Sequence, residues 1–188
     1  MAALDEPIHL SDYDAQWSDF YAAEAARISA GLPTADIAIE HIGSTAVPRL
    51  AAKPIIDVMV GAKAGQNLAA VRAALVALGY EDMGEAGAPG RIYLRKRAEQ
   101  AFNVALVEYV GRHWRSNLAL RDFLRMNPKA AQEYAEIKAK AFKQGLCSLL
   151  AYSDFKHVFV TKLVREALAF KSLHNDQNQS RKDLPDGR

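Results

Sequence analysis

The spacing of apolar residues changes several times in the first half of the chain, and each change predicts a different element. In residues 17–28 apolar side chains recur every three or four positions, which is typical of an amphipathic helix. Residues 35–42 alternate as a strand does, and residues 54–60 form a short apolar run rich in Ile and Val. Helical spacing returns in residues 66–78, and Gly79 is the expected terminator. This half therefore alternates helices with strands.

The second half begins with strands and then becomes helical. Strands are expected at residues 91–95 and 101–109, joined by a polar turn. Further on, Asn127 is the expected N-cap of a helix with Pro128 at its first position, and Ser153 is expected to start another helix. Together the elements predict an α/β or α+β fold, in which a sheet has flanking helices and is followed by a helical C-terminal portion.

The composition at the end of the chain differs from that of the rest. Residues 172–188 are polar and lack apolar periodicity, so we expect a disordered tail. Residues 1–171 are then expected to form one domain, which suits a chain of 188 residues.

Composition and charge narrow the class of protein. Half of the residues are hydrophobic and 24% are charged, as in an ordinary soluble globular protein, and a net charge of +2 does not indicate a nucleic-acid partner. Cys147 is the single cysteine, which excludes an intrachain disulfide and favours a reducing compartment. No apolar run approaches about 18 residues, and no leader pattern is present. We therefore expect a cytoplasmic protein that does not enter a membrane.

Residues 39–60 hold the clearest indication of chemistry. Gly43 and Ser44 end one apolar run, and Asp57 lies inside the next. A Gly-Ser turn exposes backbone N–H groups and a hydroxyl, which suits a phosphate, although such a pair is also common as a simple strand-ending turn. A carboxylate on a facing strand can hold the Mg²⁺ that accompanies nucleotide phosphates. This layout is expected of a nucleotidyl-transfer site with an NTP as substrate.

The same stretch resembles the signature of the GrpB family through the segment HIGSTAVPRLAAKPIID, residues 41–57. Further segments are similar to other family blocks, in the family's order: residues 11–17, 90–96, 118–138 and 152–160. The resemblance covers nearly everything except the tail. It implies the fold of the nucleotidyltransferase superfamily, with a mixed sheet, flanking helices and a helical C-terminal portion.

This chain departs from the acidic pattern that the resemblance implies. The superfamily normally has two acids two residues apart, which face the same side of a strand, but Met59 follows Asp57 here and its thioether is a poor Mg²⁺ ligand. A third acid normally comes from a neighbouring strand, where this chain has Asn103. Asn103 can hydrogen-bond a substrate or offer a carbonyl oxygen, but it cannot act as a general base. Asp57 is accordingly predicted as a catalytic metal ligand or, alternatively, as a structural acid paired with an arginine such as Arg91 or Arg95.

Other residues of the signature are candidates for roles around the phosphates. His41 lies two residues before Gly43 and is predicted to act as a proton shuttle or hydrogen-bond donor near Ser44, or else as a structural histidine. Thr45 is a second candidate in the turn. Lys53 is predicted either to reach a phosphate as a flexible point charge or to be solvated.

Two further groups are candidates for the opposite side of the site. Arg91, Tyr93 and Arg95 share a face if they form a strand, so the two guanidinium groups could clamp a triphosphate or carboxylate, or form a solvated surface. Residues of the helical part match family blocks and could line a second wall or form an ion-paired helix interface: Arg121, Asp122, Tyr134, Lys138, Tyr152 and Lys156. The predicted substrate-binding residues are Asn103, Tyr93, Tyr134, Lys138 and Lys156.

These observations favour an enzyme that transfers a nucleotidyl group from an NTP, with Mg²⁺, to a small-molecule acceptor, or that activates a carboxylate for amide formation. The alternative is a ligand-binding or partner-stabilising module that retains the fold without turnover, and Met59 and Asn103 favour it. The sequence contains no P-loop, no G-x-S-x-G elbow and no zinc-ligand spacing.

Overall fold

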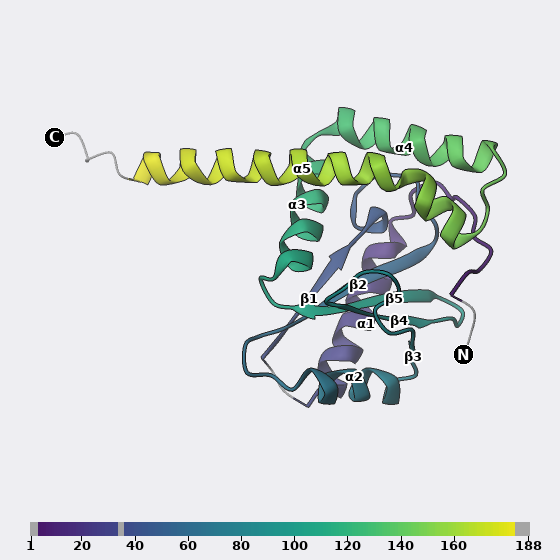
Figure 1. Ribbon diagram of the computed structural model, residues 1–188, viewed down its shortest axis with the longest axis vertical. Helices are drawn as coiled ribbons and strands as arrows, with labels where there is room; N and C mark the ends of the chain where they lie inside the picture. Colours follow the sequence, from purple (N-terminus) through teal and green to yellow (C-terminus); the bar gives the residue numbers. More distant parts are fainter. Residues whose placement is uncertain (1–3, 34–35, 183–188) are drawn as a thin grey trace.

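The computed structural model describes residues 4–33 and 36–182, and within these residues five strands form one mixed sheet (Figure 1). The strand order is β1-β2-β5-β4-β3, in which β2 and β5 are parallel and the other neighbours are antiparallel. The strands are β1 (Ile37–Ile42), β2 (Ile55–Ala62), β3 (Glu81–Asp82), β4 (Arg91–Lys96) and β5 (Ala101–Glu108). The α+β class that the sequence predicts is confirmed.

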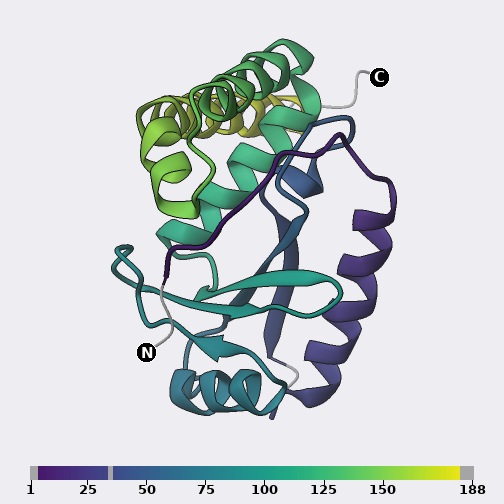
Figure 2. The same cartoon turned by 90° about the vertical axis from the view of Figure 1, so that its right-hand side faces the viewer.

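Helices cover both faces of this sheet and continue into a helical portion (Figure 2). Helices α1 and α2 pack on one face, where Val58 and Val60 of β2 are fully buried, whereas α3 packs on the other face around Met59. Helices α3, α4 and α5 then share a separate apolar cluster. The helices are α1 (Gln16–Gly31), the short 3₁₀ helix η1 (Ser44–Ala46), α2 (Leu68–Ala77), α3 (Arg112–Met126), α4 (Pro128–Lys143) and α5 (Leu149–Lys182).

The predicted start of α4 is confirmed and that of α5 is corrected. The Asn127 side chain accepts a hydrogen bond from the Ala130 N–H at 3.4 Å, and Pro128 is the first helical residue. Helix α5 begins at Leu149 rather than at Ser153, because the Ser148 hydroxyl accepts a hydrogen bond from the Ala151 N–H at 3.4 Å. The earlier start adds one helical turn that packs beside the end of α4.

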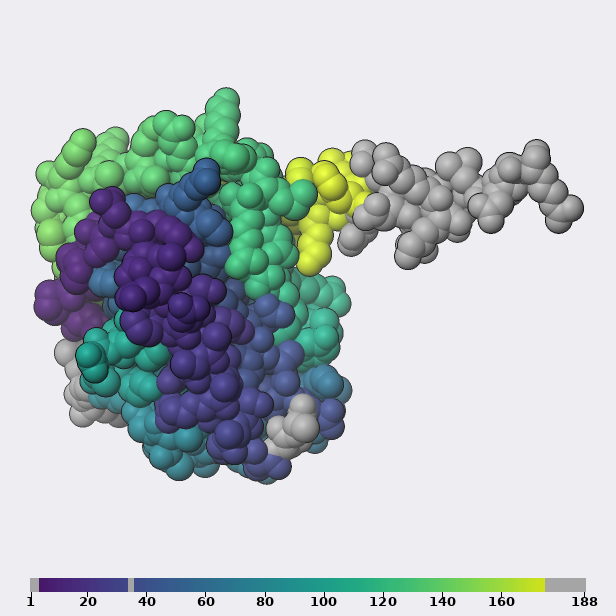
Figure 3. All heavy atoms as spheres, turned by 180° about the vertical axis from the view of Figure 1, so that it is seen from behind, coloured from purple at the N-terminus to yellow at the C-terminus, as the bar shows by residue number. Residues whose placement is uncertain are grey.

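The N-terminal segment before α1 links the helical portion to the sheet portion (Figure 3). The Ile8 N–H donates to the Cys147 carbonyl at 2.8 Å, just before α5. The Ser11 N–H donates to the Ala52 carbonyl at 2.9 Å, just before β2. These backbone bonds fix the position of the start of α5 relative to the start of β2. Both segments contribute side chains to the cavity described in the next subsection.

Helix α5 continues past the predicted domain boundary and projects from the rest of the molecule (Figure 1). Its backbone is helical as far as Lys182, and the side chains of Ser172, Leu173 and His174 are exposed. The sequence predicts a disordered tail from residue 172, but the backbone of residues 172–182 is helical, and residues 183–188 lie outside the described residues. No helix in the described ranges is both long and apolar enough to cross a membrane.

Removal of residues 172–188 is expected to leave the melting temperature almost unchanged, because the first side chains of this segment are exposed and contribute little apolar burial. Differential scanning calorimetry of the full and shortened chains measures the effect. A decrease of several degrees would show that the segment docks on the body.

Candidate functional site

The turn after β1 lies directly against the carboxylate of Asp57. Antiparallel pairing places Ile42 opposite Asp57, and Gly43 then takes φ 72° and ψ −171° to leave the strand. A Cβ atom on Gly43 would lie 2.5 Å from Asp57 Oδ2. Only glycine combines this positive φ with so close an approach, so the predicted Gly-Ser turn has a steric requirement for its glycine.

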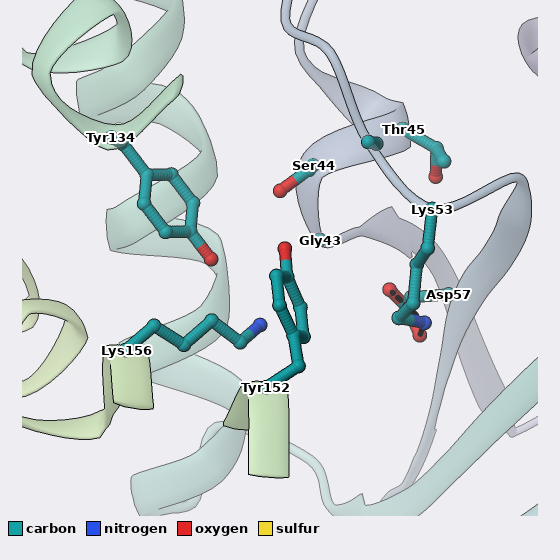
Figure 4. A pocket seen from close by; sticks show the side chains of 9 residues that line it. Gly43, Ser44, Thr45, Lys53, Asp57, Tyr134, Tyr152 and Lys156 are labelled. Carbon is teal, nitrogen blue, oxygen red and sulfur yellow. Dashed lines mark hydrogen bonds and ion pairs between the residues drawn. The ribbon is translucent and has the colours of Figure 1, made fainter. Parts of the chain in front are cut away.

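A cavity of about 70 Å³ opens beside this turn (Figure 4). One wall comes from the turn and from the start of β2, with Ser44, Lys53 and Asp57 as its polar groups. The opposite wall comes from α4 and α5, whose side chains point toward the turn in Figure 4. The complete lining is Gly43, Ser44, Thr45, Ala52, Lys53, Asp57, Tyr134, Tyr152 and Lys156.

Asp57 is hydrogen-bonded on the protein side and remains accessible on the cavity side, with its side chain 26% exposed. It accepts a hydrogen bond from Asn103 Nδ2 at 2.7 Å and lies 3.4 Å from Lys53 Nζ. Parallel pairing of β2 with β5 sets Asn103 opposite Asp57. The structural partners of Asp57 are therefore Lys53 and Asn103, not the arginines Arg91 or Arg95.

Asn103 and Tyr93 lie behind Asp57 rather than in the cavity. The Asn103 carbonyl oxygen accepts hydrogen bonds from the Tyr93 hydroxyl at 2.8 Å and from Arg97 at 2.9 Å. Since that oxygen is engaged and the amide N–H points to Asp57, Asn103 orients the carboxylate. Its predicted contact with substrate, like that of Tyr93, stays a prediction.

Asp57 is also the single candidate metal ligand of the predicted set. Within residues 4–33 and 36–182, no group of three or more His, Cys, Asp or Glu side chains is placed to hold a metal ion. Met59 continues the face of Asp57 and is fully buried. Mg²⁺ is often held by one or two carboxylates together with substrate phosphates and water. One carboxylate thus fits Mg²⁺ only in company with a phosphate ligand.

Lys138 lies behind Ser44 and is completely buried, with 0% of the residue exposed. Its Nζ is 3.3 Å from Ser44 Oγ, 4.5 Å from the centre of the Tyr134 ring, and also donates to the Ala51 carbonyl. Burial, with a smaller contribution from the charge of Lys156, lowers the pKa of Lys138 to about 7. The amine therefore titrates near neutral pH.

Two more lysines give the cavity a positive lining. Burial lowers the pKa of Lys53, and the neighbouring Asp57 carboxylate opposes that shift. Lys156 enters from α5, with its Nζ 4.6 Å from the centre of the Tyr152 ring. With Lys138 behind Ser44, three amines surround a cavity lined by one carboxylate.

His41 lies outside the cavity and supports the turn from the α1 side. Its ring stacks on Tyr21 at 4.5 Å, and its Nε2 is hydrogen-bonded to Thr45 Oγ1 at 3.0 Å. Burial, assisted by Arg125 and Arg121 and opposed by Asp57, lowers the pKa of His41 to about 4. A neutral imidazole at pH 7 thus orients Thr45, and the predicted proton shuttle stays a prediction.

Arg91 and Arg95 share a face of β4 with Tyr93, as alternation predicts, but the structure does not bring them to the cavity. Arg91 donates to the carbonyls of Glu85 and Ala86, both at 3.2 Å. Arg95 donates to Glu81 at 2.7 Å. These bonds hold both side chains near the β3 side of the sheet, where Arg91 Nε and Arg95 Nη1 are buried without a hydrogen-bond partner among the described residues. Neither arginine lines the cavity, so the predicted phosphate clamp gains no support from their positions.

Of the residues that the sequence offered for a second wall, Tyr134, Tyr152 and Lys156 line the cavity. Tyr152 precedes Lys156 by four residues, which places both on one face of α5. Sequence reasoning gave no role to Arg97, which donates to the Asn103 carbonyl oxygen.

The sequence offered an ion-paired helix interface as the alternative role for Arg121. Arg121 takes that role, since it binds Glu40 at 2.7 Å and Asp122 at 2.8 Å.

The arrangement defines a cationic pocket between a mixed sheet and a helical portion, and comparison with known proteins identifies the family. Residues 7–166 match the GrpB protein family, so the chain belongs to this family. It is 31% identical over 169 residues to the UPF0157 protein YqkA of Bacillus subtilis, covering 89% of this chain and 49% of that protein. The chain therefore spans about half the length of this relative.

A second relative and a solved structure cover more of their own lengths. The chain is 36% identical over 149 residues to a UPF0157 protein of Streptomyces coelicolor, covering 79% of this chain and 78% of that one. The crystal structure of the conserved protein GrpB from Enterococcus faecalis superposes with a TM-score of 0.77 at 32% identity. That match covers 87% of this chain and 99% of the other.

Gly43→Ala is expected to destabilise the fold by roughly 2–4 kcal/mol, because it adds a clash with Asp57 to the cost of a positive φ. Gly79→Ala is the matched control, since Gly79 has φ 86° and a Cβ there would meet nothing within 4 Å. Urea denaturation of both variants measures the difference. Equal losses of stability would contradict the close approach to Asp57.

Stability is expected to fall as the pH decreases from about 6.5 toward 4, because the unfolded chain protonates His41 before the folded chain does. The contribution of His41 is present above the ordinary pKa of histidine and is lost as pH falls through the folded value. His41→Gln should remove roughly 2 kcal/mol of this pH dependence. Urea denaturation across the range tests it, and parallel profiles for both proteins would contradict burial of the neutral ring.

Proposed function

We propose that this GrpB protein binds the phosphates of a nucleoside triphosphate in the cavity beside Ser44 and transfers the nucleotidyl group to a small-molecule acceptor. The observation that carries the proposal is the charge of the cavity. Lys53 and Lys156 line it, against the single carboxylate of Asp57 among the lining residues. Such a surface favours a multiply charged anion.

The size of the cavity favours a phosphate group over a complete nucleotide inside it. Its volume of about 70 Å³ is far below the roughly 300 Å³ at which drug-sized pockets begin. One phosphate therefore occupies the cavity, where the Ser44 hydroxyl donates to its oxygen and Lys156 supplies charge. The nucleoside extends outward past the mouth.

Mg²⁺ belongs to this proposal as a companion of the nucleotide. Asp57 would hold it together with phosphate oxygens, and the ion would neutralise charge that develops on those oxygens. Asn103 keeps the Asp57 carboxylate in place through the 2.7 Å hydrogen bond. The same residues also serve the activation of a carboxylate for amide formation, with an acid as the acceptor.

A ligand-binding module without turnover is the second candidate. Asp57 already has Lys53 and Asn103 as partners, so the carboxylate is satisfied without a metal ion. Fully buried Met59 offers no oxygen to a second ligand position. A module of this kind would bind phosphate through the same lysines and Ser44, and it would lack nucleotidyl transfer.

Nucleotide binding is expected to depend on Ser44 and Lys156. Ser44→Ala should weaken triphosphate binding by roughly 1–2 kcal/mol, the scale of a hydrogen bond to a charged group, and Lys156→Met should weaken it as well. Lys162→Met is the matched control, because Lys162 lies on the same helix with its side chain 71% exposed and outside the cavity lining. Isothermal calorimetry with ATP, GTP, CTP and UTP, with and without Mg²⁺, measures the affinities. No binding at millimolar nucleotide would refute the proposal.

Asp57→Asn distinguishes transfer from binding alone. For an enzyme, the variant should lose Mg²⁺-dependent transfer of radiolabelled nucleotide while it keeps phosphate affinity from the lysines. Stability needs a separate control, since the substitution leaves the Lys53 amine without its carboxylate. Lys53→Met combined with Asp57→Asn should recover that stability in urea melts with EDTA. A protein that binds nucleotide and transfers none supports the non-catalytic module.

A further inference from the structure

Lys138 is a buried amine that lies behind Ser44 and is not among the residues that line the cavity. It is completely shielded from solvent, and in the described part of the chain it forms an ion pair with no carboxylate. Its Nζ lies between two oxygens, the Ala51 carbonyl and Ser44 Oγ, the latter at 3.3 Å. No carboxylate balances a charged ammonium there, so its compensation is limited to these two oxygens and the face of the Tyr134 ring.

The surroundings of Lys138 act on its protonation in opposite directions. The groups that face its Nζ are the Ala51 carbonyl, the Tyr134 ring from its own helix, Lys156 from α5 and the Ser44 hydroxyl from η1; the oxygens and the ring face stabilise an ammonium, whereas burial and Lys156 oppose it. None of these is an anion at neutral pH. Burial and the charge of Lys156 lower the pKa of Lys138 to about 7, so the neutral amine is accessible near neutral pH. A neutral amine can donate to Ala51 and still accept a proton from Ser44.

Ser44 has the complementary position. It lines the cavity, with the buried amine behind it and the cationic side chains of Lys53 and Lys156 among the lining residues. A serine hydroxyl is a weak nucleophile until a neighbouring base within hydrogen-bond reach removes its proton. A phosphate in the cavity would lie against the hydroxyl, on the side away from Lys138.

We propose that Lys138 is the general base for Ser44, and that Ser44 is a nucleophile which carries the nucleotidyl group as a covalent phosphoester between two half-reactions. The inference rests on the proposed nucleotidyl transfer and adds a covalent intermediate to it. Elements η1 and α4 bring the small cavity, the hydroxyl and the buried amine together, although Ser44 and Lys138 are 94 residues apart in sequence.

The first half-reaction forms the bond between Ser44 Oγ and the α-phosphorus of the NTP. The bond from that phosphorus to the bridging oxygen of pyrophosphate breaks, pyrophosphate leaves with the electron pair, and the serine proton passes to Lys138. In the second half-reaction the acceptor hydroxyl attacks the phosphorus. The Oγ–phosphorus bond breaks, Ser44 takes back the proton from Lys138, and the acceptor's proton passes to water.

The test is intact-protein mass spectrometry after incubation with ATP and Mg²⁺ in the absence of an acceptor. We expect the mass of one nucleotidyl group on the protein, located to Ser44 by peptide mapping, with release of one pyrophosphate. Ser44→Ala should form no adduct. Lys138→Met should slow adduct formation by roughly 10²-fold or more, the scale of general-base catalysis, and Lys162→Met should leave it unchanged.

The pH profile of the unmutated protein tests the base without any substitution at a buried position. The rate of adduct formation should rise with pH through about 7 and then level off, as Lys138 loses its proton.

Lys138→Arg keeps a cation at the position and cannot act as a base, so it should also fail to form the adduct. An adduct at an undiminished rate in folded Lys138→Arg would overturn the assignment of Lys138.

The outcomes separate this inference from the proposed function. Nucleotide binding with transfer to an acceptor, but with no adduct on Ser44, overturns the covalent intermediate and leaves the proposed function intact. An absence of nucleotide binding in calorimetry overturns both. An adduct that maps to another residue also refutes the assignment of Ser44.

Discussion

The contact between Gly43 and Asp57 is the constraint on which the site depends. Strand pairing brings the end of β1 opposite Asp57, and the chain must then turn within van der Waals reach of the carboxylate. A glycine with φ 72° makes this possible, and the turn places Ser44 at the start of η1. The hydroxyl and the carboxylate thus line the same cavity because one residue has no side chain.

The second wall depends on contacts between distant parts of the chain. Backbone bonds from the N-terminal segment reach Cys147 before α5 and Ala52 before β2. They hold the helical portion near the turn, so that Lys138 reaches Ser44 Oγ at 3.3 Å and Lys156 enters the cavity. The amines are crowded and partly desolvated, which lowers the pKa of Lys53 and Lys138. An anionic ligand would relieve their mutual repulsion.

Much of the fold could be predicted from local sequence patterns. The partners of individual side chains could not be predicted in this way. Apolar spacing identified α1, α2 and the longer strands, and Asn127 with Pro128 marked the start of α4. The two-residue strand β3 was missed, because so short a segment has no periodicity to detect.

In the candidate site, likewise, neighbours within the sheet could be predicted from the sequence and long-range partners could not. Adjacent strands that begin at similar positions explain why Asp57 and Asn103 meet, and alternation correctly put Arg91, Tyr93 and Arg95 on one face. Alternation cannot tell which groups that face meets. Arg95 finds Glu81 on the neighbouring strand, and Arg97 finds Glu6 from the N-terminal segment, through folding that no local pattern encodes.

The number of carboxylates at the cavity decides how it would attract a phosphate. Asp57 is the one carboxylate among the lining residues, and three amines lie within or directly behind that lining. A site with several carboxylates repels phosphates until metal ions neutralise it, but amines attract phosphates directly. Under the proposed function, phosphate affinity would therefore come chiefly from the lysines, and a metal ion at Asp57 would act on the transfer step more than on binding. In that proposal the protonation state of Lys138 would control the transfer step rather than the affinity.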